Sequence, residues 1–227
     1  MKHTTNTQPW PFPYQFIAIE GNIGAGKTTL TRMIAEDYGC RLVLEQFADN
    51  PFLPYFYENP ERHAFTVELF FMTERHKQLQ DELAQQDLFQ QRAVADYFFL
   101  KTLLFARNNL NEEEYRLFQR LFHILNANAP KPDLILYLHR PVESLMANIQ
   151  SRGREYEQNI SPEYLAQIQD AYFDFFKTEP SIPILIVDAG NLDFVRFPTH
   201  YQNLLSAINQ VHEPGVQNIV LHQTQVV

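Results

Sequence analysis

The sequence predicts a three-layer α/β fold, in which a five-stranded parallel sheet lies between two layers of helices. Two observations predict the layers. Short apolar runs typical of buried strands alternate with longer segments of helical spacing. The run at 133–138 is apolar on both faces, as central strands of a parallel sheet tend to be. With 227 residues, of which 45% are hydrophobic, the chain can build one domain, with or without a small insertion.

Each element has its own signal. The first strand is expected at 16–20, and the first helix runs from Lys27 to Tyr38 and stops at Gly39. The other strands are expected at 41–45, 93–96, 133–138 and 182–187. The other helices are expected at 61–86, 111–127, 141–150, 161–177 and 199–211. Residues 46–60 hold three prolines among aromatics, which predicts a structured loop or short helical turns.

These elements place the domain at residues 16–212. Residues 1–15 are polar and carry three prolines, so we expect a flexible lead-in. Residues 213–227 show no assignable element and are expected to form a tail.

The composition excludes several classes of protein. Lys and Arg number 18 against 27 Asp and Glu, for a formal net charge of −9, so a surface for a nucleic acid polymer is not expected. A single cysteine, Cys40, excludes a disulfide framework and a cysteine-based zinc cluster. No apolar run approaches the ~18 residues of a membrane span, and the N-terminus lacks the apolar core of a signal peptide. We therefore expect a cytoplasmic protein with no membrane partner.

The segment after the first strand matches the phosphate-binding pattern G-x-x-x-x-G-K-[ST] at every fixed position. It reads Gly21, Asn22, Ile23, Gly24, Ala25, Gly26, Lys27, Thr28, and Thr29 continues it into the helix. Glycines let successive backbone N–H groups turn toward a phosphate. Lys27 would reach the β- and γ-phosphates, Thr28 would bind Mg²⁺, and the helix N-terminus would face the same anion. The pattern predicts a nucleoside triphosphate site.

Two arginines later in the chain suit the same ligand. Arg152 and Arg154 flank Gly153 at the end of a predicted helix, where they could close over the γ-phosphate. Taken alone, this segment is equally typical of a solvated helix terminus.

The chain resembles the deoxynucleoside kinase family, which includes the deoxycytidine, deoxyadenosine and deoxyguanosine kinases. The resemblance covers about 16–210 and rests on Glu20 to Leu30, Leu44-Glu45, Asn50 to Leu53, Tyr57-x-x-Pro60-Glu61-Arg62, Arg152 to Glu157 and Asp193-Phe194. It implies the P-loop kinase version of the predicted α/β fold, with the strand order 2-3-1-4-5, a helical lid at about 150–160, and a homodimer. Apolar stripes on the helices at 61–86 and 111–127 could serve such an interface, although such stripes more often face a core.

The resemblance also implies roles for single residues. Glu45 resembles the general base that accepts the proton of the sugar 5′-hydroxyl, and a carboxylate at the end of a strand faces the crevice where α/β proteins bind ligands. Tyr57 and Glu157 resemble the pair that binds the sugar 3′-hydroxyl. Arg152 and Arg154 resemble lid arginines on the donor phosphates.

A further pair, Asp193-Phe194, resembles the loop that holds the donor base. Two alternatives, each with a structural role only, stay open at this point. Tyr57 could pack within its loop, and Asp193 could cap a helix.

The sequence departs from the family at three places. The family motif Glu/Asp-Arg-Ser after the third strand is replaced by Asp96-Tyr97, so its arginine is absent; Asp96 can keep the acidic role near Mg²⁺. Lys101 follows one helical turn later and could restore a positive charge, without the bidentate geometry of arginine. Asn148 stands where the family has another arginine, four residues before Arg152.

The third departure concerns the base of the substrate. Glu68 stands where the family has a glutamine that reads the base edge. An ionised carboxylate only accepts hydrogen bonds and so suits guanine, whose N1–H and 2-amino groups are adjacent donors. We therefore expect a purine, guanine over adenine. The alternative is that Glu68 pairs with Arg75 or Lys101 and touches no base.

The predicted function is Mg²⁺-dependent transfer of the γ-phosphoryl group of ATP to the 5′-hydroxyl of a deoxynucleoside. Thr28 and Asp96 would hold the metal ion. One alternative is a nucleoside monophosphate kinase such as thymidylate kinase, in which Arg75 or Arg92 would face the phosphate of the acceptor. The other is a catalytically weak nucleotide-binding module, which the missing arginine at Tyr97 favours.

Overall fold

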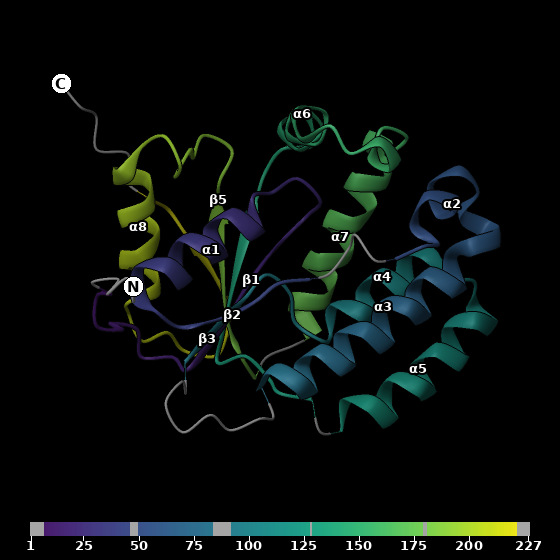
Figure 1. Ribbon diagram of the computed structural model, residues 1–227, viewed down its shortest axis with the longest axis horizontal. Coiled ribbons are helices and arrows are strands. Elements are labelled where there is room, and N and C mark those ends of the chain that lie inside the picture. The colour runs from purple at the N-terminus through teal and green to yellow at the C-terminus, as the bar shows by residue number, and fades with distance from the viewer. Residues whose placement is uncertain (1–6, 46–49, 84–91, 128, 179–180, 222–227) are drawn as a thin grey trace, which may run out of the picture.

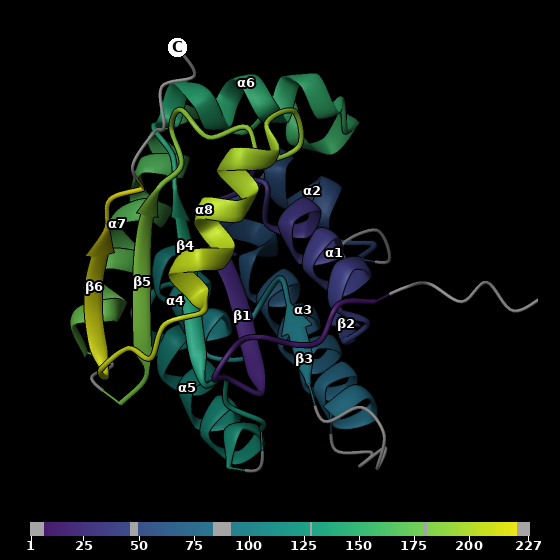
Figure 2. The same ribbon diagram turned by 90° about the vertical axis from the view of Figure 1, so that its left-hand side faces the viewer.

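The computed structural model describes residues 7–45, 50–83, 92–127, 129–178 and 181–221. One parallel sheet of six strands forms its centre, in the order β2-β3-β1-β4-β5-β6 (Figures 1 and 2). The strands are β1 (Phe16–Gly21), β2 (Arg41–Val43), β3 (Ala93–Ala95), β4 (Leu134–His139), β5 (Pro183–Asp188) and β6 (Gly215–Ile219). The predicted fold class and the order 2-3-1-4-5 are confirmed.

Helices connect the successive strands along the chain. They are α1 (Lys27–Tyr38), α2 (Leu53–Glu58), α3 (Pro60–Leu83), α4 (Lys101–Asn109), α5 (Glu112–Asn126), α6 (Val142–Arg152), α7 (Pro162–Thr178) and α8 (Pro198–Ile208), with a 3₁₀ turn η1 (Glu155–Glu157). The first helix has the predicted bounds, and α4 was not predicted. No helix among the described residues is long and apolar enough to span a membrane.

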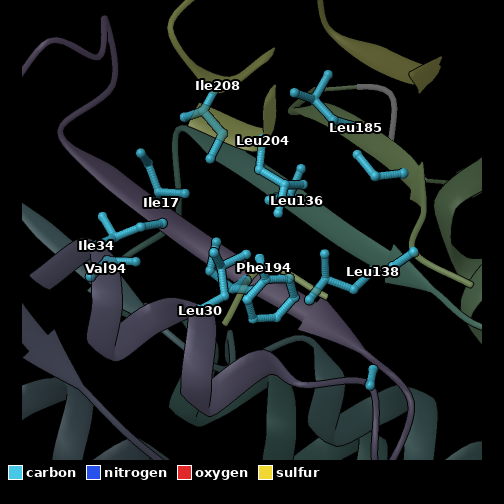
Figure 3. Close-up of a cluster of buried hydrophobic side chains, with 14 of the residues drawn as sticks. Ile17, Leu30, Ile34, Val94, Leu136, Leu138, Leu185, Phe194, Leu204 and Ile208 are labelled. Carbon is cyan, nitrogen blue, oxygen red and sulfur yellow. The ribbon is translucent and has the colours of Figure 1, made fainter. Parts of the chain in front are cut away.

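Alternate residues of the central strand β1 face the two helical layers. Ile17 and Ile19 point to the layer of α1, α6 and α8, whereas Ala18 points to α4 and α7. Figure 3 shows the first of these cores, where Ile17 lies among Leu30, Ile34 and Ile208. In Figure 1 the sheet is seen between the two layers, with α3 and α5 beside α4. Burial on both faces explains why the central strands β1 and β4 are mostly apolar.

The sixth strand lies in the segment that the sequence analysis left as a tail. Gly215–Ile219 pairs in parallel with β5, with Gly215 opposite Pro183. Its residues alternate between half-buried and exposed because it is the edge strand. An edge strand of this kind has a weak apolar signal, which is why the expectation of five strands and an element-free tail is wrong for these residues.

The lead-in is also ordered where the structure describes it. Trp10, Phe12 and Tyr14 are buried in the core beside α1 and α8. The Trp10 Nε1 donates to the Tyr14 carbonyl at 2.9 Å, and the Tyr14 hydroxyl donates to the Gln210 carbonyl at 3.0 Å. The expectation of a flexible lead-in is therefore wrong for residues 7–15, because alternate aromatics outweigh the prolines; residues 1–6 lie outside the described residues.

Candidate active site

The carboxyl ends of the parallel strands meet at one edge of the sheet, and the predicted site residues gather there. The phosphate loop follows β1, Glu45 follows β2, and Asp96 follows β3. Arg140 follows β4, and the loop 189–197 follows β5. This is the edge at which open α/β sheets bind ligands.

The three glycines of the phosphate loop all have positive φ: 153° at Gly21, 82° at Gly24 and 96° at Gly26. All three are also tightly packed. A Cβ on Gly21 would lie 2.8 Å from the Leu138 carbonyl oxygen, one on Gly24 would lie 2.9 Å from the Leu145 carbonyl oxygen, and one on Gly26 would lie 3.2 Å from the ring of Phe194. The loop therefore requires glycine for its backbone conformation and for close packing, as a phosphate cradle does.

Lys27 opens helix α1 from within this loop. Its Nζ donates to the Asn22 carbonyl at 2.9 Å, and the Asn22 side chain donates to the Leu165 carbonyl at 2.7 Å. Burial lowers the pKa of Lys27 to about 8, with repulsion from Lys101 acting in the same direction. The side chain is thus held at the loop, at the positive end of a helix, where an anion would be bound.

Thr28 and Asp96 lie in direct contact. The Thr28 hydroxyl donates to Asp96 Oδ2 at 2.5 Å, and the Glu45 backbone N–H donates to Asp96 Oδ1 at 2.7 Å. A hydroxyl and a carboxylate beside a phosphate loop form the oxygen donor set that Mg²⁺ prefers. Among the described residues no group of three or more His, Cys, Asp or Glu side chains could hold a metal ion, so this pair would need phosphate and water oxygens to complete the coordination.

Two cations hold the Glu45 carboxylate. Arg75 donates to Oε1 through Nε at 2.7 Å and through Nη2, and Lys101 donates to Oε2 at 2.9 Å. Burial alone would raise the pKa of Glu45, but the two cations outweigh it and lower that pKa to about 2. The carboxylate is therefore ionised at neutral pH, and the two cations fix its orientation.

Lys101 compensates for the arginine of the family motif that Tyr97 replaces. The Tyr97 side chain is fully buried and its hydroxyl donates to Gln78 at 2.9 Å, away from Glu45. The positive charge comes instead from Lys101, at the start of the unpredicted helix α4, and from Arg75 on α3. In the sequence, the only indication that Arg75 belongs to the site was its position on the same predicted helix, two turns after Glu68.

A further buried acid, Glu20, was not predicted to belong to the site. Its carboxylate accepts from the Tyr172 hydroxyl at 2.7 Å and from the Phe98 N–H at 3.1 Å, and Lys101 Nζ lies 3.9 Å away. Burial raises the pKa of Glu20, while Lys101 and Lys27 act against that rise. Glu20 thus helps to fix Lys101 beneath the phosphate loop.

The two lid arginines share one partner. Arg152 donates to Oε2 of Glu157 through Nε at 3.0 Å and Nη2 at 2.5 Å, and Arg154 donates to Oε1 at 3.2 Å. Glu157 is buried, and the neighbouring Tyr156 ring stacks on Tyr57 with 6.4 Å between ring centroids. The structure therefore brings Tyr57, Glu157 and both arginines together at the lid.

The loop before α8 packs against the phosphate loop. Phe194 is buried against Gly26, and Arg140 donates to the carbonyl oxygens of Ala25 and Leu192, at 3.0 and 2.7 Å. The Asp193 side chain accepts from the Arg196 N–H at 2.8 Å within the loop, and α8 begins only at Pro198 with Phe197 as its N-cap residue, so the alternative that Asp193 caps this helix is wrong. Asn148 joins the same region by donating to the Gly24 carbonyl at 2.8 Å.

Glu68 lies on α3 and is buried. Its Oε1 accepts from the Asn109 amide at 2.6 Å, and its Oε2 has no hydrogen-bond partner among the described residues. Burial raises the pKa of Glu68 to about 7, although Arg75, Asn109 and Lys101 act in the opposite direction. Neither Arg75 nor Lys101 is a hydrogen-bond partner of this carboxyl in the described part of the chain, so the ion pair expected as the alternative is not formed.

These groups surround a cavity of about 800 Å³. Its lining includes most of the predicted site residues, namely Ile23, Gly24, Ala25, Gly26, Lys27, Thr28, Thr29, Tyr57, Glu68, Arg152, Arg154, Glu157, Asp193 and Phe194. The other four, Gly21, Asn22, Glu45 and Asp96, are buried beneath it. Residues that the sequence analysis gave no site role, Asn109, Arg140 and Tyr164, also line the cavity, because they reach it from elements far away in the chain.

Comparison with known proteins agrees with this geometry. The family model described as deoxynucleoside kinase matches residues 17–213. A deoxyguanosine kinase of Bacillus subtilis is 34% identical over 200 residues, covering 86% of this chain and 97% of the relative. A deoxyadenosine kinase of Lactobacillus acidophilus is 26% identical over 210 residues, covering 86% and 95%.

Solved structures show the same likeness. The deoxyadenosine kinase from M. mycoides with bound dATP superposes with a TM-score of 0.74 at 25% identity, covering 86% of this chain and 100% of that chain. The family match spans the phosphate loop, Glu45, the lid and the loop before α8, which are the parts that form the cavity. The chain belongs to the deoxynucleoside kinase family, whose members are phosphotransferases that act on deoxynucleosides.

Proposed function

We propose that this kinase transfers the γ-phosphoryl group of ATP to the 5′-hydroxyl of a deoxypurine nucleoside, with guanine preferred over adenine. The observation that carries the base preference is the carboxyl group of Glu68, which lines the cavity with one oxygen lacking a partner among the described residues. The likeness to a deoxyguanosine kinase of Bacillus subtilis supports a purine, and relatives named deoxyadenosine kinases keep adenine as the competing base.

Glu45 is the proposed base for the 5′-hydroxyl. Arg75 and Lys101 keep it ionised, which is the form that can accept a proton. A low pKa is tolerable here, because phosphoryl transfer depends mainly on positioning and charge neutralisation and little on the strength of the base.

The remaining charged groups serve the donor. Lys27 and the lid arginines Arg152 and Arg154 would neutralise the phosphates, and Thr28 and Asp96 would hold Mg²⁺, which would supply further positive charge there. Glu157 aligns both arginines and, with Tyr57, is proposed to bind the sugar 3′-hydroxyl. The loop carrying Asp193 and Phe194 would border the donor base.

The base preference follows from hydrogen-bond chemistry. Ionised Glu68 offers acceptors on Oε2 and on the second lone pair of Oε1, which match the adjacent N1–H and 2-amino donors of guanine. Pyrimidine deoxynucleosides lack this pair of donors on one edge. A site built to bond such donors discriminates strongly against bases that leave its polar atoms unpaired.

An ADP-release assay across the four natural deoxynucleosides tests the proposal. We expect deoxyguanosine to give the highest kcat/KM and the Glu68→Gln variant to lose that preference. Glu45→Gln should lower kcat about 100-fold or more with every nucleoside. Equal or better use of deoxycytidine by the native enzyme, or no shift of base preference in Glu68→Gln, contradicts the guanine assignment.

The two alternative functions have less support. Arg75 is engaged by Glu45 and Thr102, and Arg92 precedes β3, at the opposite edge of the sheet from the cavity. Arg75 lines the cavity with its guanidinium already engaged, and Arg92 lies at the other edge, so neither supports the binding of a nucleoside monophosphate. The catalytically weak module was favoured by the missing arginine, and Lys101 now supplies that charge. Assays with dGMP and dTMP beside the nucleosides separate these functions.

The homodimer stays a prediction. Helix α5 exposes Leu117 and Ile124 on its outer side, which supports an apolar contact but identifies no partner. Light scattering of the purified chain would measure the assembly state.

A further inference from the structure

Asn109, at the end of α4, has all the polar atoms of its side chain engaged. Its Nδ2 donates to Glu68 Oε1 at 2.6 Å and to the Tyr164 hydroxyl at 3.3 Å, and its Oδ1 accepts from the Asn108 side chain at 3.0 Å. A flipped amide would place Oδ1 against a carboxylate oxygen, two acceptors in contact. The amide orientation is therefore fixed, and with it the carboxyl plane of Glu68.

This contact makes the two oxygens of Glu68 unequal. Oε1 accepts a hydrogen bond from Asn109, whereas Oε2 is buried without a partner among the described residues. A proton taken up by this carboxyl therefore resides on Oε2, since a proton on Oε1 would compete with the Asn109 donor. Protonation turns Oε2 from an acceptor into a donor without moving the side chain.

Both protonation states are accessible near neutral pH. The charged groups that face Glu68 are Arg75 from the same helix, Lys101 from α4 and Glu45 from the end of β2, with the uncharged Asn109 and Tyr164 beside them. Burial raises the pKa of Glu68 to about 7, and Glu45 adds to the rise. Arg75, Asn109 and Lys101 limit it.

We propose that Asn109 is a positioning residue for base recognition, and that it makes the choice between guanine and adenine depend on the protonation of Glu68. Ionised Glu68 presents two acceptors to the N1–H and 2-amino donors of guanine. Protonated Glu68 donates from Oε2 to adenine N1, while Oε1 accepts from the 6-amino group. This inference rests on the proposed function, in which Glu68 reads the base.

The test is the ratio of kcat/KM for deoxyguanosine to kcat/KM for deoxyadenosine, measured from about pH 6 to about pH 8. Because one base requires the ionised carboxyl and the other the protonated one, the ratio should rise about tenfold per pH unit. Other titrating groups of the site act on both substrates alike and cancel in the ratio. A ratio that does not change with pH overturns the inference.

Variants assign the effect to the two residues. In Glu68→Gln the ratio should lose its pH dependence and favour deoxyadenosine, because an amide keeps one donor and one acceptor at all pH values. Asn109→Asp keeps the shape but places a second acid beside Glu68, which raises the pKa of Glu68, so the ratio at pH 7 should fall about tenfold. The matched control is Asn126→Ala, at the end of α5, which should keep the native ratio and slope.

The outcomes separate this inference from the proposed function. If deoxyguanosine remains the best substrate but the ratio is flat, or if Glu68→Gln keeps the slope, the protonation model is wrong and the purine assignment stands. If Asn109→Asp behaves as the native enzyme, Asn109 does not position Glu68. If neither purine nucleoside is phosphorylated, the proposed function itself fails.

Discussion

At the scale of single residues, the site depends on how Glu45 is held. Arg75 comes from α3 and Lys101 from α4, and each binds a different oxygen of the carboxylate. Lys101 also lies 3.9 Å from Glu20, so one ammonium group connects two buried acids. Removal of such a partner leaves a buried charge uncompensated, which costs more than the pair itself contributes.

We expect Lys101→Met to lower kcat about 100-fold, because Glu45, the proposed base, loses one of the two groups that orient it. The same change should destabilise the fold by about 3 kcal/mol. Lys177→Met is the matched control, since Lys177 pairs with Asp174 in an exposed salt bridge and should change stability by less than about 0.5 kcal/mol. Steady-state kinetics and thermal unfolding measure both effects. A stability loss with native kcat would show that Lys101 acts only in the fold.

At the scale of elements, the edge strand β6 is linked to the N-terminal segment through one side chain. The Tyr14 hydroxyl donates to the Gln210 carbonyl at 3.0 Å and accepts from the His212 N–H at 2.9 Å, just before β6 begins. Residues almost two hundred positions apart therefore hold the connection between α8 and β6 in place.

Tyr14→Phe removes only that hydroxyl, and we expect it to lower the free energy of unfolding by about 1–3 kcal/mol, because two backbone groups lose their partner. Tyr55→Phe removes the same group from a side chain that is 56% exposed and should have almost no effect. Chemical denaturation of the three proteins measures the difference. Equal stability of Tyr14→Phe and the native chain would mean that water replaces both bonds.

The phosphate loop allows a second comparison at this scale. Gly24 and Gly215 both have positive φ, 82° and 103°, but a Cβ on Gly24 would lie 2.9 Å from the Leu145 carbonyl oxygen, whereas one on Gly215 meets nothing within 4 Å. Gly24→Ala should therefore raise the KM for ATP about tenfold or more by displacing the loop. Gly215→Ala should cost about 1–2 kcal/mol of stability and leave that KM unchanged. Similar KM values for the two variants would contradict the packing argument.

The elements that the sequence predicted are those with a local signal. The phosphate loop and α1 follow from a contiguous motif, and the bounds of α1 are as expected. Helix α4 was missed because no cap or apolar stripe was recognised at 101–109. The role of Arg75 was missed because its contact with Glu45 spans 30 positions of the chain. Ion pairs between distant elements have no periodic pattern by which a sequence could reveal them.

At the scale of the whole molecule, the chain is acidic, but its site buries both acids and cations. Of the five buried acids among the described residues, Glu157 pairs with the two lid arginines, and the other four, Glu20, Glu45, Glu68 and Asp96, lie with three buried cations, Lys27, Arg75 and Lys101. Burial raises the pKa of Glu20, Glu68 and Asp96, and only Glu45 has a lowered pKa. Glu45 and the three acids with raised pKa values therefore change the free energy of unfolding in opposite directions as the pH changes.

The sign of each contribution predicts the pH of maximum stability. Glu68, with its pKa raised from 4.5 to about 7, destabilises the fold progressively as pH rises through that window. Glu45, with its pKa lowered from 4.5 to about 2, loses its stabilising contribution as pH falls through that window. We expect the melting temperature to be highest on the acid side of neutrality. Glu68→Gln should raise the melting temperature at pH 8, corresponding to a gain of about 3 kcal/mol at most in the free energy of unfolding, and leave it unchanged near pH 4. A native maximum above pH 8 would contradict this account.

The contact between the two loops at the donor end has a consequence for engineering. Phe194 fits against Gly26 only because that glycine has no side chain, and Arg140 binds a carbonyl oxygen on each loop. In a chimera that takes only the segment 189–197 from a relative, the side chain at the position of Phe194 would not be matched to the phosphate loop of this chain. The phosphate loop, Arg140 and that segment therefore pack as one unit, and a chimera has to exchange all three together to keep these contacts.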